Sequence, residues 1–348
     1  MPIPVVWSPE TRRHEPMREV WVGVPTEGTE VPERVDRILE ALGGRTLVEA
    51  EPHDDDMLRR VHAPEFVDHL ASIHAEWLEG PYVDLVGQDR VVPYVFPTPA
   101  MTQGMPPTRA AATHGRAGQF GYDTMTLVGP GTWEAARAAV DCAQTAADLV
   151  IGGERAAYAL CRPPGHHATR DGYGGSCYLN NSAIAAQALR DAGHATVAVV
   201  DLDAHHGNGT QAIFWDRGDV RYGSLHVDPA AGWFPHFFGH ASETGIGEGE
   251  GATRNLPLAE GTGDGPWLDA VRQLAEFASG ADALVVSLGV DAAADDPESP
   301  LQVTADGYAG AGRVLGSLGV PAVVVQEGGY HLDTIGGLVA AYLAGHEN

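Results

Sequence analysis

The chain has 348 residues, with 47 Asp or Glu against 21 Lys or Arg, and a formal net charge of −26 at pH 7. This length suits one large α/β domain or two ordinary ones. So negative a charge argues against nucleic acid and anionic membranes as partners, because both require a basic surface. It favours a cationic substrate, although a simple role in solubility explains it equally well.

Targeting and redox features predict a cytoplasmic protein. The segment 1–7 has neither a basic region nor a long apolar core, so no signal peptide is expected. No uninterrupted apolar run approaches membrane-spanning length. The three cysteines, Cys142, Cys161 and Cys177, form no spaced framework, which is typical of reduced, buried thiols.

The first third of the chain predicts strands and helices followed by a long insertion. Strands are expected at 5–7 and 46–49, and helices at 32–42, 54–62 and 64–79. In the insertion, at about 80–131, proline-rich runs preclude a regular helix or a central strand. A loop of this length in a compact domain is usually a lid, a binding wall or a subunit contact.

From residue 132 onwards, short Val/Ala/Leu-rich strands alternate with helices. Thr132 is expected to cap a helix that ends near Ile151. Strands are then expected at 157–161, 196–201, 220–226, 283–289 and 322–326, with helices at 180–191, 210–215, 266–279, 304–318 and 334–343. The alternation predicts a mostly parallel sheet covered by helices on both faces. Since there is no repeat or linker, we expect one domain over 1–348.

The end of the expected strand 196–201 is acidic and histidine-rich. Period-two alternation places Asp201, Asp203 and His205 on one side of the chain. Ligands bind at the carboxyl ends of strands in open α/β sheets, and Asp with His suits a divalent metal such as zinc. A helix N-cap with two solvated histidines is the alternative, but it does not explain so many polar groups.

Three other expected strands also end in polar residues. They lead into Arg-Pro-Pro-Gly-His-His (162–167), Ser-Leu-Gly-Val-Asp (287–291) and Glu-Gly-Gly-Tyr (327–330). In a parallel sheet these ends converge on one crevice. Together with Asp-Leu-Asp-Ala-His-His-Gly-Asn-Gly-Thr-Gln (201–211), the motifs resemble the zinc-dependent histone deacetylase superfamily. The resemblance is greatest to bacterial acetylpolyamine amidohydrolases and class II deacetylases. It implies the arginase–deacetylase fold, a single α/β domain with a parallel sheet of about eight strands.

The resemblance also implies a catalytic metal site. Asp203, His205 and Asp291 match the metal ligands, and two carboxylates with one imidazole leave positions open for water and substrate. Zinc is the implied ion, with ferrous iron as an alternative. His167 matches the general base and acid, and His166 matches a protonated, electrostatic partner.

Other matched positions support these groups. Tyr330 matches the hydroxyl that donates to the developing oxyanion. Asn208 stands where some relatives have an aspartate, so we expect His167 to be neutral near pH 7. Asp201 matches the carboxylate behind His166. The resemblance further implies a structural potassium ion, with Asp201, Asp203, His205, Ser224 and Leu225 as its ligands.

Departures from the family pattern bear on the substrate. Ser176, after Gly175, stands at a wall position that is usually aromatic, and Trp233 matches the opposite wall. Glu298 matches a gatekeeper glutamate of the eukaryotic polyamine-deacetylating branch, although a solvated loop glutamate is the alternative. The insertion resembles one that forms a dimer interface in acetylpolyamine amidohydrolases, so we expect a homodimer.

The main functional hypothesis is metal-dependent removal of an acetyl or other acyl group from a cationic amine such as an acetylpolyamine. The alternatives are deacetylation of acetyl-lysine proteins or peptides and deacylation of a specialised-metabolite intermediate. A two-manganese ureohydrolase would need a further carboxylate where Gly207 stands. A catalytically inactive sensor of acetylated ligands is disfavoured, because every expected catalytic position is filled.

Overall fold

The computed structural model describes residues 2–106 and 108–348. Its centre is an eight-stranded sheet of order β4-β1-β5-β10-β9-β6-β7-β8, in which all paired strands are parallel. The strands are β1 (Val5–Trp7), β4 (Leu47–Glu49), β5 (Ala156–Ala159), β6 (Val197–Asp201), β7 (Val220–Val227), β8 (Thr253–Leu258), β9 (Ala283–Leu288) and β10 (Ala322–Gln326). The expected α/β class is confirmed.

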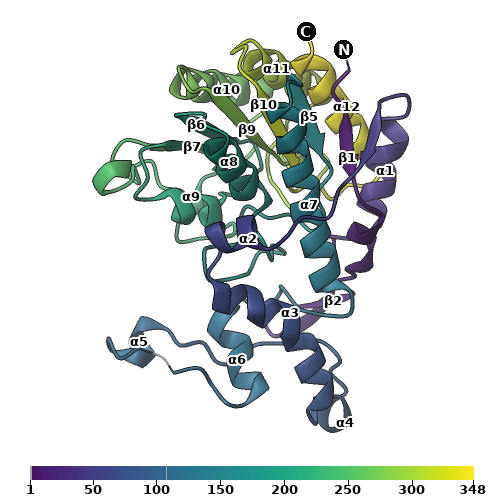
Figure 1. Cartoon of the computed structure of the whole chain (residues 1–348), viewed down its shortest axis with the longest axis vertical. Helices are drawn as coiled ribbons and strands as arrows, with labels where there is room; N and C mark the ends of the chain where they lie inside the picture. Colours follow the sequence, from purple (N-terminus) through teal and green to yellow (C-terminus); the bar gives the residue numbers. More distant parts are fainter. Residues whose placement is uncertain (1, 107) are drawn as a thin grey trace.

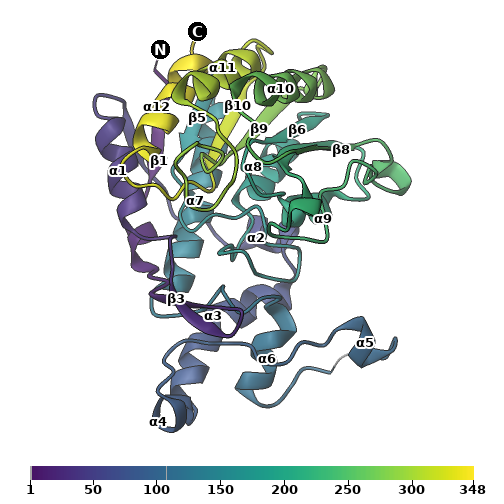
Figure 2. The same cartoon turned by 180° about the vertical axis from the view of Figure 1, so that it is seen from behind.

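Helices cover both faces of this sheet (Figures 1 and 2). One face carries α7 (Thr132–Ile151) and α8 (Asn181–Asp191), with α2 (Asp56–Val61) packed on α8 and α3 (Pro64–Glu79) extending this layer towards the insertion. The other carries α1 (Glu33–Ala41), α10 (Asp264–Ala278), α11 (Ala305–Gly316) and α12 (Ile335–His346). None of the helices within the described residues is both long and apolar enough to span a membrane.

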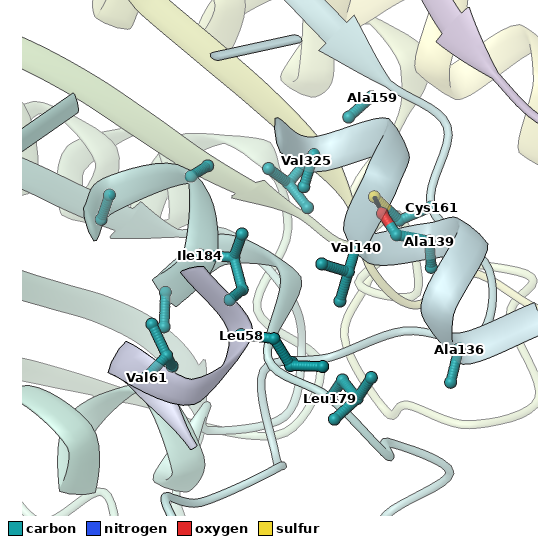
Figure 3. Close-up of a cluster of buried hydrophobic side chains, with 14 of the residues drawn as sticks. Leu58, Val61, Ala136, Ala139, Val140, Ala159, Cys161, Leu179, Ile184 and Val325 are labelled. Atoms are coloured by element: carbon teal, nitrogen blue, oxygen red, sulfur yellow. Dashed lines mark hydrogen bonds between the residues drawn. The ribbon is translucent and has the colours of Figure 1, made fainter. Parts of the chain in front are cut away.

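Strand side chains alternate between two hydrophobic clusters, one on each face of the sheet. Val323 and Val325 of β10 belong to the first cluster, and Ala322 and Val324 to the second. Figure 3 shows the first cluster, where Val325 lies near side chains of α2, α7 and α8. Every central strand is buried on both faces, which explains why these strands are near-continuous apolar runs in the sequence.

The insertion is more ordered than the sequence indicates. It contains three short helices, α4 (Tyr82–Val86), α5 (Pro99–Thr102) and α6 (Thr113–Phe120), at the end of the molecule away from both termini (Figure 1). The prolines do not prevent these helices, because they lie between them or in a first turn, as Pro99 does in α5.

Three further features differ from expectation. An antiparallel hairpin of β2 (Arg18–Trp21) and β3 (Val24–Glu27) has no Asn-Gly or Asp-Gly turn signal, since Val22 and Gly23 form its turn. Strand β8 was not expected, because its first residues belong to a glycine-rich stretch of the sequence. Gly131, not Thr132, is the N-cap of α7, because the Thr132 hydroxyl accepts from the Gly129 N–H at 2.9 Å instead.

Candidate active site

Two adjacent strands bring the expected metal ligands together. Asp203 and His205 follow β6, and Asp291 follows the neighbouring β9. One ligand atom from each of these residues lies within 4.8 Å of the other two, and Asp203 and Asp291 are fully buried. The group could therefore hold a metal ion at the carboxyl ends of the strands.

The surroundings of this group fit a divalent cation. Two carboxylates are buried side by side, and burial followed by the charge of Asp203 raises the pKa of Asp291 to about 8. A bound cation would relieve this repulsion. Gly328 makes room for the group, since a Cβ there would lie 2.5 Å from an Asp291 carboxylate oxygen. Two oxygen donors and one nitrogen donor leave coordination positions free, as in catalytic zinc sites.

The tandem histidines lie beside these ligands and differ in charge. His166 Nδ1 is 3.1 Å from Asp201 Oδ2. Burial lowers the pKa of His166, but the charges of Asp203 and Asp201 outweigh burial and raise this pKa to about 10. His167 Nδ1 is 2.7 Å from Asn208 Oδ1, and burial, followed by the charges of His166 and His205, holds the pKa of His167 well below its usual value. The pair therefore combines a charged imidazole with a neutral one.

Tyr330 is held by a buried arginine that the sequence analysis missed. The Arg34 guanidinium lies 4.8 Å from the centre of the Tyr330 ring. Its Nε and Nη2 groups donate to the carbonyls of Gly329 and Glu327, each at 2.6 Å. Burial raises the pKa of Tyr330 well above its usual value, although Arg34 opposes this, so the phenol stays protonated and can donate. The available signal in the sequence was that Arg34 is next to Val35 and four residues before Ile38, two apolar residues that α1 buries.

The Glu327 side chain connects two of the motifs by hydrogen bonds. Its Oε2 accepts from the backbone N–H groups of Gly165 and His166 at 2.7 and 3.1 Å. Its Oε1 accepts from the Ser182 hydroxyl at 2.8 Å. This one carboxylate therefore joins the loop that carries Tyr330 to the turn that carries both histidines.

The aromatic wall beside His167 is formed by Phe234 rather than by the expected Trp233. The rings of Phe234 and His167 are 4.7 Å apart and nearly perpendicular, whereas Trp233 packs against the second hydrophobic cluster. Both residues lie in the loop after β7, and the wall position expected at Trp233 is taken one residue later, by Phe234. Gly175 leaves room for both rings, and Ser176, at φ 60°, follows it.

The residues expected to hold potassium lie on adjacent strands. Asp201 of β6 is in register with Ser224 of β7, and Leu225 follows Ser224. The Ser224 hydroxyl is 2.8 Å from His226 Nδ1, and Asp203 and His205 follow Asp201 directly along the chain. The structure brings the five residues into one region, and their cation remains a prediction.

Carboxylates from separate segments gather near this site. Glu298 Oε1 accepts from the Thr29 hydroxyl at 2.9 Å, and Asp123 Oδ2 accepts from the Gly175 N–H at 2.6 Å. Burial, followed by the charges of Glu298 and Asp123, raises the pKa of Glu19 to about 8. Glu19 and Asp123 were missed, because neither lies in a motif.

Comparison with known proteins places the chain in a family. The model of the histone deacetylase domain matches residues 28–346. The chain belongs to the histone deacetylase family. The expected family membership and arginase–deacetylase fold are thereby confirmed.

Proteins named acetylpolyamine amidohydrolase or aminohydrolase align with almost the whole chain. The acetylpolyamine amidohydrolase of Mycoplana ramosa is 39% identical over 348 residues, with 98% of each chain covered. Acetylpolyamine amidohydrolase 1 of Pseudomonas aeruginosa is 39% identical over 351 residues, again with 98% of each chain covered. The crystal structure of the acetylpolyamine aminohydrolase of Burkholderia pseudomallei matches with a TM-score of 0.91 and 38% identity, over 99% of this chain and 98% of that one.

Proposed function

We propose that this histone deacetylase family protein is a metal-dependent amidohydrolase that removes the acetyl group from an acetylated polyamine. Relatives named acetylpolyamine amidohydrolases align with it from end to end. The observation that carries the chemistry is the buried Asp203, His205 and Asp291 group with His166, His167 and Tyr330 around it. The enzyme is a deacetylase, and the proposal concerns the class of its substrate and the identity of its metal.

We propose zinc as the metal, with ferrous iron as the alternative occupant. Bound by Asp203, His205 and Asp291, zinc would polarise the acetyl carbonyl and activate a water molecule. Asp201, Asp203, His205, Ser224 and Leu225 are the proposed ligands of a structural potassium ion. The buried, unpaired thiols of the three cysteines support a reducing compartment, the cytoplasm.

The neutral His167 is the proposed general base and acid. Its Nε2 accepts the proton of the attacking water and then delivers that proton to the leaving amine nitrogen. His166 stays protonated beside Asp201 and stabilises negative charge. The Tyr330 hydroxyl donates to the acetyl oxygen as negative charge develops on it.

A cationic amine is the proposed leaving group. Asp123 and Glu298 place negative charge next to the wall formed by Gly175 and Ser176, and their charges, after burial, raise the pKa of the nearby Glu19. An ammonium group among these carboxylates would relieve their mutual repulsion. Ser176 stands where the family pattern has an aromatic ring, so this wall lacks that ring.

A homodimer is the proposed assembly. The insertion exposes large apolar side chains at Leu85, Tyr94, Met101 and Met105, and the hairpin exposes Trp21. Clusters of exposed apolar side chains are typical of protein–protein contacts. A second copy of the chain is the proposed partner.

The first experiment compares kcat/KM of the zinc-loaded protein on acetylputrescine, acetylcadaverine, N8-acetylspermidine and an acetyl-lysine peptide, for the wild type and for Glu298→Leu. We expect a preference for the free polyamines that falls about tenfold in the variant, because one charge of the carboxylate group is lost. A preference for the peptide would contradict the substrate proposal. Metal analysis and loss of activity on chelation test the metal separately, and full activity without metal would contradict it.

A further inference from the structure

The backbone that follows the catalytic histidine is held by hydrogen bonds from several elements. Each of the five carbonyls of residues 166–170 accepts a hydrogen bond from a different donor. In chain order of the carbonyls, the donors are the Thr210 N–H at 3.1 Å, the Tyr122 hydroxyl at 2.8 Å, Asn180 Nδ2 at 2.9 Å, His62 Nδ1 at 2.9 Å and the Ala63 N–H at 2.7 Å. The position of the His167 backbone, and of the imidazole that it carries, therefore depends on contacts outside its own motif.

His62 is the imidazole among these donors. It is the C-cap of α2 and is fully buried. Its Nδ1 lies 2.9 Å from the Thr169 carbonyl oxygen, and its Nε2 lies 2.9 Å from the backbone nitrogen of Asn180. The ring therefore bridges a carbonyl two residues after His167 and the N-cap of α8.

These two contacts determine which ring nitrogen of His62 carries the hydrogen. A backbone N–H can only donate, so Nε2 accepts from Asn180. A carbonyl can only accept, so Nδ1 carries the hydrogen and donates it to Thr169. Burial lowers the pKa of His62 to about 4, so the ring is neutral at pH 7 and can make both contacts.

The two ring nitrogens act on different parts of the structure. Asn180 has other contacts, because its Oδ1 accepts from the Ala183 N–H and its Nδ2 donates to the Ala168 carbonyl, each at 2.9 Å. Loss of the acceptor Nε2 would therefore leave a buried N–H unpaired, which lowers stability, while Asn180 stays in place. Loss of the donor Nδ1 would release the Thr169 carbonyl in the segment that continues from His167.

We infer that His62 is a positioning residue: as its neutral Nδ1–H tautomer it holds the Thr169 carbonyl and thereby keeps the His167 imidazole in place. Because misplacing a catalytic group by about 1 Å can cost about 100-fold in rate, a small shift of this backbone affects catalysis. The inference rests on the proposed role of His167 in deacetylation.

Two substitutions separate the two polar atoms of the His62 ring. The amide nitrogen in His62→Asn can take the place of Nδ1, whereas the amide oxygen in His62→Gln can take the place of Nε2. We expect kcat on an acetylated polyamine to fall about tenfold in His62→Gln, with KM within about twofold, and to stay within about twofold of the wild type in His62→Asn. The urea midpoint should fall in both variants, because each leaves one buried backbone group unpaired.

His74 provides the matched controls. Its Nε2 lies 3.1 Å from the Asp89 carbonyl oxygen, which belongs to the insertion and not to the segment after His167. His74→Asn and His74→Gln should both retain wild-type kcat. An equal fall of kcat in both His62 variants would assign His62 a purely structural role and overturn the inference. A fall in His62→Asn alone, or an unchanged kcat in His62→Gln, would overturn it as well.

A readout without substrate separates this inference from the proposed function. Ring ¹⁵N shifts of the wild-type protein report the His62 tautomer directly and require no variant to fold. We expect a neutral ring with its hydrogen on Nδ1, and a hydrogen on Nε2 or a charged ring would overturn the inference. The His167 ring signals should move in His62→Gln but not in His62→Asn. These results in a protein without any deacetylase activity would overturn the proposed function alone.

Discussion

Buried charges hold the catalytic loops in place. Arg34, Arg162, Glu30 and Glu327 are each at most 2% exposed. Arg162 donates to the carbonyls of Thr11, His14 and Glu30, and its Nε lies 2.9 Å from a Glu30 carboxylate oxygen. Because buried charges are tolerated only when they are paired and hydrogen-bonded, these contacts join the N-terminal segment to the turn that carries His166 and His167.

Arg34→Lys should lower kcat about 100-fold, with a smaller effect on KM. A lysine ammonium cannot donate in the arginine fork to the carbonyls of Gly329 and Glu327, so Tyr330 would shift from its position. Steady-state kinetics on an acetylated polyamine measure this. Arg12→Lys, at an exposed pair with Asp36, is the control and should change neither constant. Wild-type kcat in Arg34→Lys would show that other contacts hold Tyr330.

Among the helices, α11 and α12 approach each other unusually closely. A Cβ on Gly312 would overlap the Tyr342 carbonyl, and a Cβ on Gly345 would overlap the Ala309 carbonyl. Glycines at both positions therefore let the two backbones touch. Gly337, also in α12, has open space where its Cβ would lie.

This difference predicts opposite effects of two similar substitutions. Gly312→Ala should lower the free energy of unfolding by about 1–3 kcal/mol, because α12 must move away. Gly337→Ala should raise it by about 0.5–1 kcal/mol, because alanine favours the helix. Urea unfolding measures both, and deacetylase activity at 25 °C should remain unchanged. Equal effects at the two sites would mean that the close approach of α11 and α12 does not control stability.

For the molecule as a whole, buried neutral histidines set the response to acid. Burial lowers the pKa of His62 and of His226 to about 4, and that of His69 to about 3. An unfolded histidine titrates near 6.5, so the unfolded chain binds more protons than the native one below that pH. Their contribution to stability is complete above pH 6.5 and is lost progressively as the pH falls towards 4. Burial raises the pKa values of Glu19 and Glu327 to about 8 and about 7, so these two carboxyl groups make the free energy of unfolding decrease as the pH rises.

His69→Phe should make the protein more resistant to acid. His69 lies 4.6 Å from the Phe120 ring, and within the described part of the chain neither of its ring nitrogens has a hydrogen-bond partner. Phenylalanine removes the titrating group. The slope of unfolding free energy against pH between 4 and 6.5 should therefore decrease by up to about 1.4 kcal/mol per unit. An unchanged slope would mean that His69 is not buried as the neutral form.

The metal ligands, the tandem histidines and the parallel sheet were predictable from sequence, because each is a local pattern. Short apolar runs specify strands that are buried on both faces, and polar residues directly after them must meet at one edge of a parallel sheet. Asp203, His205 and Asp291 follow from this argument although 86 residues separate the last two.

The groups that hold and surround the site depended on tertiary structure. Arg34 and Asp123 lie in no motif, and each reaches the site across a contact between segments distant in sequence. Phe234 and Trp233 are neighbours whose side chains point in different directions, which composition and spacing do not reveal. The sequence by itself therefore determined the sheet and the chemistry of its strand ends. Only the tertiary structure decided how those groups are oriented, because orientation comes from side-chain contacts between distant segments rather than from local pattern.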